Sequence, residues 1–139
     1  MEIIRRINDE LAIAGSITTV DLEQIAIEGY KSILNLRSLD HHHLSAQQQN
    51  VEYLGLRYVN LPIDVEVMSP EIAVKVLKQI DQLPKPALVC CNNATLAAAM
   101  VLMHIAIGQG ETLQQAFKRA ESLGLFRSYA SQLSAPSVS

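Results

Sequence analysis

The sequence has no run of basic residues and only a small excess of acidic ones. Lys and Arg number 11 against 14 Asp and Glu, which gives a formal net charge of −3 and a pI of about 5.7. A nucleic-acid or anionic-membrane surface needs a basic stripe that displaces counterions. We therefore expect neither nucleic acid nor a membrane as a partner.

Long apolar runs are also missing. The longest one, over residues 96–107, contains His104 and is too short to cross a bilayer. The first dozen residues carry five charged side chains, so no signal peptide is expected. The two cysteines, Cys90 and Cys91, are adjacent, and adjacent cysteines rarely bridge because neighbouring side chains of a strand point to opposite faces. A reduced, cytoplasmic protein is the simplest expectation.

Hydrophobic patterning predicts four short strands, over residues 11–14, 32–36, 58–63 and 87–91. The last is wholly apolar, as is typical of a central strand covered on both faces. Strands that alternate with helices form a parallel sheet with helices on both faces. No internal repeat or linker interrupts the chain, so residues 1–139 are expected to form one α/β domain, with a frayed tail over 134–139.

Helix starts are marked by capping residues. Three boxes are predicted, at Thr18 with Asp21, at Ser45 with Gln48 and at Thr112 with Gln115, and the pair 69–70 (Ser-Pro) adds a cap with a proline in the first turn. Apolar residues then recur at helical spacing. The predicted helices run from Thr18 to about residue 28, from Ser45 to about 54, from Ser69 to about 83 and from Thr112 to about 123. Two more helices are expected over 95–107 and 125–133.

Cys91 is predicted to stand at the carboxyl end of the last strand, before a polar loop and the most apolar helix. Open α/β sheets bind ligands beyond the carboxyl ends of their strands. A helix N-terminus presents unpaired N–H groups, binds anions and lowers the pKa of a nearby thiol. This arrangement suits a thiolate that attacks phosphorus while backbone amides hold the phosphoryl oxygens. The plainer interpretation, the commoner one on spacing alone, is a small buried hydrophobic cysteine.

Segment 88–97 resembles the active-site loop of the protein-tyrosine and dual-specificity phosphatases, His-Cys-x-x-Gly-x-x-Arg. More closely, blocks 7–17, 30–38, 58–63, 83–91 and 112–123 resemble a bacterial family of small phosphatase-like proteins. That family is related to the phosphatase-like domain of beta-lactamase-hydrolase-like proteins, and its loop is similar to His-Cys-x-Ser-Gly-x-Arg. The resemblance implies a cysteine-phosphatase fold, and no cofactor is expected.

On this resemblance Cys91 falls on the nucleophile, but most of the other defining positions differ. Cys90 falls on the histidine, Asn93 on the serine, Ala94 on the glycine and Leu96 on the arginine. Loss of the two charge-assisted hydrogen bonds of that arginine, about 1.5–3 kcal/mol each, costs on the order of 10²–10⁴ in rate. Without the histidine, the resemblance predicts a Cys91 pKa nearer to the free value of about 8.5.

The loop can nevertheless keep its backbone shape. Alanine in place of glycine is a mild change, and asparagines tolerate left-handed geometry better than most residues. The expected phosphate-binding loop therefore consists of Asn92, Asn93, Ala94, Thr95 and Leu96. We expect weak binding of phosphate or another small anion here.

Two residues outside this loop are further candidates. Arg37 follows the second strand and could point at the carboxyl edge to bind phosphate, while Asp64 follows the third strand and could act as a general acid, with Glu66 as its neighbour. The alternative for each is an ordinary solvated side chain.

Histidines suggest a metal site at first sight. However, the three consecutive histidines of the run 40–43 (Asp-His-His-His) cannot easily share a tetrahedral ion. A solvated loop and no metal site are expected there. His104, inside the most apolar helix, is expected to be a core histidine with a hydrogen-bond partner.

Three functions stay open. The first is a degenerate phosphatase-fold protein, impaired or silent in catalysis, that binds an anion or a protein partner. The second is an active cysteine-dependent phosphatase that hydrolyses phosphate monoesters through a phosphocysteine at Cys91, with Arg37 and Asp64. The third is a rhodanese-like sulfurtransferase, because such proteins also place a cysteine in a short loop before a helix.

Overall fold

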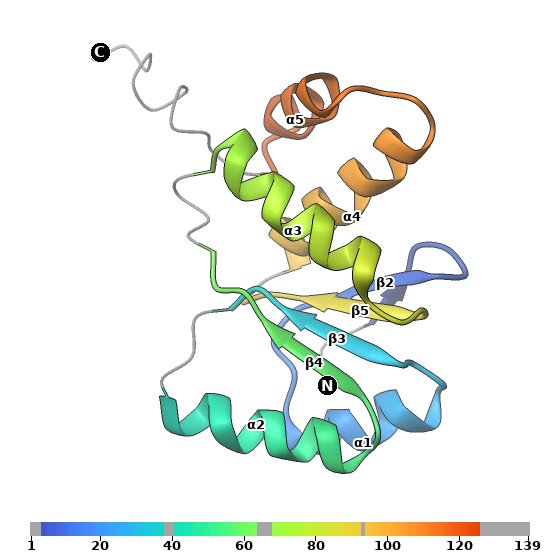
Figure 1. Ribbon diagram of the computed structural model, residues 1–139, viewed down its shortest axis with the longest axis vertical. Coiled ribbons are helices and arrows are strands. Elements are labelled where there is room, and N and C mark those ends of the chain that lie inside the picture. The colour runs from blue at the N-terminus through green and yellow to red at the C-terminus, as the bar shows by residue number, and fades with distance from the viewer. Residues whose placement is uncertain (1–3, 38–40, 64–67, 93, 126–139) are drawn as a thin grey trace.

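The computed structural model describes residues 4–37, 41–63, 68–92 and 94–125, without the side chains of residues 19 and 41–44. Its centre is a five-stranded sheet with the order β1-β2-β5-β3-β4 (Figure 1). Strands β2, β5, β3 and β4 are parallel, and β1 pairs with β2 in the antiparallel sense. The strands are β1 (Arg5–Arg6), β2 (Leu11–Ala14), β3 (Ser32–Asn35), β4 (Arg57–Asn60) and β5 (Ala87–Cys90).

The four predicted parallel strands are confirmed, and β1 is an addition. Its two arginines are exposed, so the strand carries no apolar alternation that a sequence pattern could reveal. The third strand is shorter than predicted and stops before Pro62, which lacks an N–H donor. Pairing still continues past its end, because the amides of Leu61 and Ile63 donate to the carbonyls of Asn35 and Leu36.

Helices cover both faces of the sheet, as predicted. Helices α1 (Thr19–Ile27) and α2 (His41–Tyr53) lie on one face, and α3 (Pro70–Gln82), α4 (Ala94–Gly108) and α5 (Leu113–Ser122) lie on the other (Figure 1). Alternate side chains of each strand supply two separate cores. Ile13 and Val89 pack with α3, α4 and α5, whereas Ala12 and Leu88 pack with α1 and α2.

Side-chain caps explain where three of the helices begin. Thr18 Oγ1 accepts from the amide of Asp21 at 3.4 Å, and Thr112 Oγ1 accepts from the amide of Gln115 at 3.1 Å. Ser69 Oγ accepts from the amide of Ile72 at 3.3 Å, one residue before the proline at the start of α3. Both capping boxes and the Ser-Pro start are therefore confirmed.

The predicted start of α2 at Ser45 is wrong. The helix begins at His41, so Ser45 lies inside it and His41–His43 form part of its first turn rather than a loop. Gln48 does not complete a capping box. Its Nε2 donates to Glu52 Oε1 at 2.9 Å, a contact one helical turn along the chain. Asp40 and the helix predicted beyond Leu125 lie outside the described residues.

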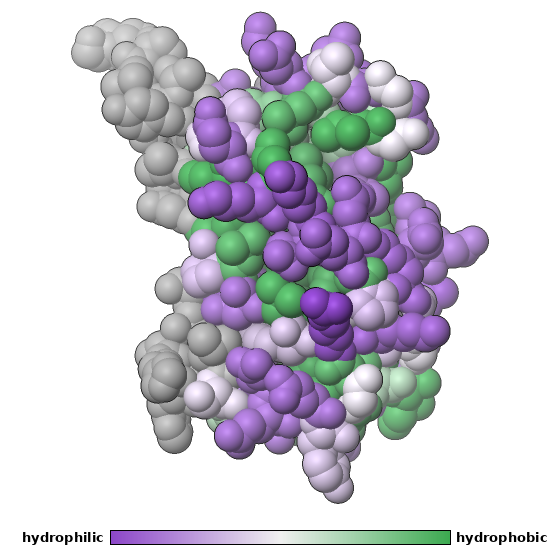
Figure 2. Space-filling view, in the orientation of Figure 1, coloured by the Kyte–Doolittle hydropathy of each residue, from purple (hydrophilic) through white to green (hydrophobic). Residues whose placement is uncertain are grey.

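Helices α3 and α4 differ in how much of their surface is covered. The outer side of α3 is hydrophilic (Figure 2), with Glu71, Lys75 and Lys78 exposed. In α4, seven of the 15 residues are buried, and one side of the helix is exposed at Thr95 and Leu102. No helix in the described part of the chain combines the length and apolar character that a membrane span requires.

Candidate functional site

Cys91 directly follows β5, the middle strand of the five-stranded sheet. Its amide donates to the carbonyl of Ala14, the last residue of β2, at 3.3 Å. On the other side, the carbonyl of Cys90 accepts from the amide of Leu36, just past β3, at 2.8 Å. Cys91 therefore lies at the carboxyl edge, between the points where two neighbouring strands end, which is where open α/β sheets bind ligands.

The two adjacent thiols belong to different cores. Cys91 is 2% exposed and lies in the cluster formed with α3, α4 and α5. Cys90 is 1% exposed and lies in the cluster formed with α1 and α2. Neither cysteine forms a disulfide. The sequence-based expectation that neighbouring side chains point to opposite faces accounts for this separation.

Cys90 is a neutral thiol at ordinary pH. Burial raises its pKa to about 12, the neighbouring Cys91 acts in the same direction, and the positive charge of Arg37 opposes both. A buried thiol of this kind is a poor nucleophile, because the thiolate is the reactive form. As a neutral, buried thiol, Cys90 cannot replace the histidine onto which the resemblance places it.

The polar loop leads into α4 within three residues. Asn92 is exposed, and its carbonyl accepts from Ser16 Oγ at 3.5 Å, which links the loop to the end of β2. Asn93 lies outside the described residues. Ala94 begins the helix and is half-buried, and Thr95 is exposed. The first amides of a helix have no partners within it and depend on groups outside the helix.

Leu96, which the resemblance places on the arginine position, is turned into the protein. Its side chain is 1% exposed and belongs to the same cluster as Met100 and Val89. An apolar residue suits this position, since burial of a leucine side chain stabilises the fold by roughly 1.5–3 kcal/mol. Helix α4 also contains no Lys or Arg. The helix that follows Cys91 therefore supplies no cation.

Arg37 lies at the same edge, one residue past the amide that bonds to Cys90. It is half-buried, and its backbone is held on both sides. Its amide donates to Asn35 Oδ1 at 2.9 Å, and its carbonyl accepts from Asn60 Nδ2 at 2.9 Å. The Arg37 charge also opposes the rise that burial causes in the pKa of Tyr58. The structure thus brings Arg37 and Cys91 to one edge, while Asp64 lies outside the described residues.

A buried polar network beside Arg37 was not predicted from the sequence. Asn35 Nδ2 donates to Tyr58 Oη at 3.0 Å and to Gln47 Oε1 at 2.9 Å, and Tyr58 Oη donates to Gln47 Oε1 at 2.5 Å. Asn60 pairs with Asn35 across β3 and β4 and donates to its carbonyl at 2.9 Å. The available signal was an asparagine at the end of each of two neighbouring strands, a residue type that strands disfavour.

Histidine and carboxylate positions give no metal centre in the described part of the chain, where no three metal-binding side chains gather. His104 is not the core residue that the sequence suggested. Its Nε2 lies 2.6 Å from Asp81 Oδ1, with side chains 25% and 69% exposed, so it joins α4 to the surface of α3.

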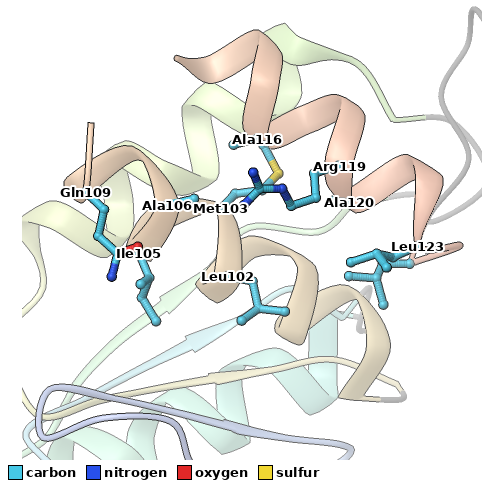
Figure 3. Close-up of a pocket in the computed structure, with 10 residues that line it drawn as sticks. Leu102, Met103, Ile105, Ala106, Gln109, Ala116, Arg119, Ala120 and Leu123 are labelled. Atoms are coloured by element: carbon cyan, nitrogen blue, oxygen red, sulfur yellow. The ribbon is translucent and has the colours of Figure 1, made fainter. Parts of the chain in front are cut away.

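A groove of about 290 Å³ lies between α4 and α5, lined by Leu102, Met103, Ala116 and Arg119 among others (Figure 3). The α4 residues that line it lie in the second half of that helix, whereas Cys91 precedes its first turn. Arg119 is paired with Glu111 at 2.6 Å. The groove is therefore separate from the Cys91 edge.

No protein-family model and no curated protein matches this sequence. Solved structures do match, over most of the chain. A "putative phosphatase" from Neisseria meningitidis is 22% identical with a TM-score of 0.67, and the match covers 88% of this chain and 89% of that one. A second protein so described, from Shewanella putrefaciens, gives 22% identity, a TM-score of 0.67 and coverage of 81% and 74%.

A third match is TpbA from P. aeruginosa, in a structure with phosphotyrosine. It is 14% identical with a TM-score of 0.63, and the match covers 88% of this chain and 74% of that one. Identities this low establish a shared fold rather than a shared activity. The chain has the α/β fold of the protein-tyrosine and dual-specificity phosphatases.

Proposed function

We propose that this chain is a phosphatase-fold protein with silent or strongly impaired hydrolysis, which binds a tetrahedral oxyanion at the Cys91 loop. The observation that carries the proposal is the burial of Leu96, which is 1% exposed at the position where the resembling family has its phosphate-binding arginine. The anion is either inorganic phosphate or the phosphoryl group of a partner.

The missing arginine affects turnover more than binding. In a phosphatase its two charge-assisted hydrogen bonds strengthen as charge develops on the transferring phosphoryl group. An apolar side chain supplies neither bond, which costs on the order of 10²–10⁴ in rate. Backbone amides remain in the first turn of α4 and can still hold an anion.

The burial of the thiol supports the same conclusion. In-line attack requires the sulfur to reach a phosphorus atom outside the sheet edge, but Cys91 is 2% exposed. Its amide is fixed to Ala14 and the following carbonyl to Ser16. The loop is thus held at both sides while its sulfur stays in the core, a combination that favours binding without hydrolysis.

An active phosphatase is the second candidate, and Arg37 is the observation that favours it. Arg37 places a positive charge at the edge where Cys91 lies. In that case Asp64 would protonate the leaving oxygen. Both candidates use the same edge, so a single set of variants separates them.

Hydrolysis of an aryl phosphate by wild type and Cys91→Ser tests the proposal directly. We expect the two proteins to show the same turnover, while phosphate binding measured by calorimetry persists in both. Fast turnover by wild type that Cys91→Ser abolishes would establish the active phosphatase instead. A parallel assay with thiosulfate and cyanide tests the sulfurtransferase alternative, which a Cys91-dependent formation of thiocyanate would favour.

Restoring the family residues provides a gain-of-function test. The triple variant Cys90→His, Ala94→Gly, Leu96→Arg is expected to raise phosphate affinity and aryl-phosphatase turnover by at least about a hundredfold, the low end of the two-bond estimate. Thermal melting must accompany the assay because two of the three positions are buried. A folded triple variant that gains neither binding nor turnover would contradict the proposal.

A further inference from the structure

At the carboxyl edge of the sheet, the cation comes from the segment after β3, whereas the resemblance places it in α4. The described residues that follow the four parallel strands are 15–18, 36–37, 61–63 and 91–92. Within these segments Arg37 carries the one positive charge, and no carboxylate is present. Any anion bound against the described part of this edge therefore meets Arg37 as its opposite charge.

Two asparagines fix the backbone of this arginine. Asn60 Nδ2 donates to the carbonyls of both Asn35 and Arg37, each at 2.9 Å, and so closes the turn at the end of β3. Asn35 Oδ1 accepts from the Arg37 amide at 2.9 Å. Three hydrogen bonds from two side chains thus act on one short segment, which is more than strand pairing alone would provide.

Asn35 is in turn held in place by side chains of β4 and α2. Asn35 is 2% exposed and Tyr58 is 8% exposed, and both bond to Gln47 on α2. Buried and mutually satisfied polar groups of this kind rigidify their surroundings. A rigid backbone lowers the entropy that an arginine loses when it binds an oxyanion, because fewer conformations remain to be lost.

We propose that Asn35 and Asn60 are positioning residues that hold Arg37 as the anion-binding cation of this edge. The inference rests on the proposed function, and it names the ligand class as tetrahedral oxyanions of the phosphate and sulfate type. Arg37 takes the place of the arginine lost at Leu96, so the charge reaches the site from β3 rather than from α4.

Calorimetric titration with inorganic phosphate and with sulfate tests the cation first. Arg37→Gln is expected to weaken binding at least about tenfold, and Arg37→Lys to weaken it less, since one charge remains without the planar fork. The matched control is Arg57→Gln, which removes an exposed arginine at the opposite end of the paired strands. This control should bind phosphate as wild type does.

The positioning role requires a second comparison. Asn60→Leu is expected to weaken phosphate binding several-fold in the wild-type background and to add nothing in the Arg37→Gln background, because residues that act through one group are not additive. Asn50→Leu, on α2, controls for the loss of an amide elsewhere. A separate reduction by Asn60→Leu in the Arg37→Gln background would show a merely structural role and overturn the inference.

The remaining outcomes separate the two proposals. If wild type binds phosphate and Arg37→Gln binds it equally well, the inference fails while the proposed anion site stands. If wild type binds neither phosphate nor sulfate, both fail. If Asn60→Leu does not fold, the Asn35→Leu variant and the pair Arg37→Gln and Arg37→Lys still decide the matter, since Arg37 is only half-buried.

Discussion

The amide of Leu36, one residue beyond β3, donates to the carbonyl of Cys90, the last residue of β5, at 2.8 Å. This hydrogen bond keeps the two strands together up to the point where the functional residues leave the sheet. It fixes the start of the segment that contains Arg37 relative to the one that contains Cys91. Disturbing either segment should therefore affect the other.

Alkaline conditions should reveal the buried thiol of Cys90. Its pKa is raised from 9.0 to about 12 in the folded protein, so the unfolded chain loses this proton first as the pH rises. The resulting loss of stability begins near pH 9, ends near pH 12 and reaches about 2 kcal/mol at pH 10.5. At neutral pH the thiol is protonated in both states and contributes no pH dependence.

Urea unfolding of wild type and Cys90→Ala at pH 7 and pH 10.5 measures this effect. The variant should be less stable at pH 7, because a small cavity replaces the sulfur, but it should lose less stability between the two pH values. Equal losses in both proteins would rule out the buried Cys90 thiol as the cause.

Leu96→Arg alone should destabilise the fold. The side chain is 1% exposed, so the substitution removes a buried leucine and introduces a charge into the same apolar cluster. We expect the free energy of unfolding to fall by about 3 kcal/mol or more. Leu96→Met, which conserves the volume, should cost less than about 1.5 kcal/mol. An arginine variant as stable as the methionine variant would mean that this position can turn outward.

Tyr58→Phe should weaken the network that holds Asn35. The hydroxyl bonds to both Asn35 and Gln47 in a largely buried setting, so its removal is expected to cost about 1–3 kcal/mol in chemical denaturation. The matched control is Tyr53→Phe, because Tyr53 is 91% exposed at the end of α2. Equal effects of the two substitutions would show that the network adds no stability.

The pair His104 and Asp81 should contribute little, despite its distance of 2.6 Å. Asp81 is 69% exposed, and solvent screens such pairs. A double-mutant cycle with His104→Gln and Asp81→Asn at neutral pH is expected to give a coupling below about 1 kcal/mol. A coupling of several kcal/mol would instead make the link between α3 and α4 a principal determinant of stability.

The sequence predicts the sheet well because its four parallel strands are short and apolar, and because capping residues mark the starts of α1, α3 and α5. It fails at α2, because no helix-breaking residue precedes the Ser-x-x-Gln pattern at 45–48 and the helix already begins at His41. It also misses β1, which consists of two exposed arginines.

The candidate site, too, is only partly predictable from the sequence. Local spacing places Cys91 after a strand and before a helix. Hydrogen bonds between Asn60 and the end of β3 depend on which strands become neighbours, and the sheet order is not encoded in any local pattern. The network around Asn35 therefore emerges only with the fold.

The placement of two adjacent cysteines in two separate cores has an experimental use. Each thiol lies in the core on a different face of the sheet, Cys90 in the cluster shared with α1 and α2 and Cys91 in the cluster shared with α3, α4 and α5. A labelling reagent can reach each sulfur only when its own core opens. With Cys91→Ser and Cys90→Ser as single-thiol proteins, labelling rates would report the opening of each core separately. The labelling rates of two neighbouring residues would thus report independently on the two halves of the molecule.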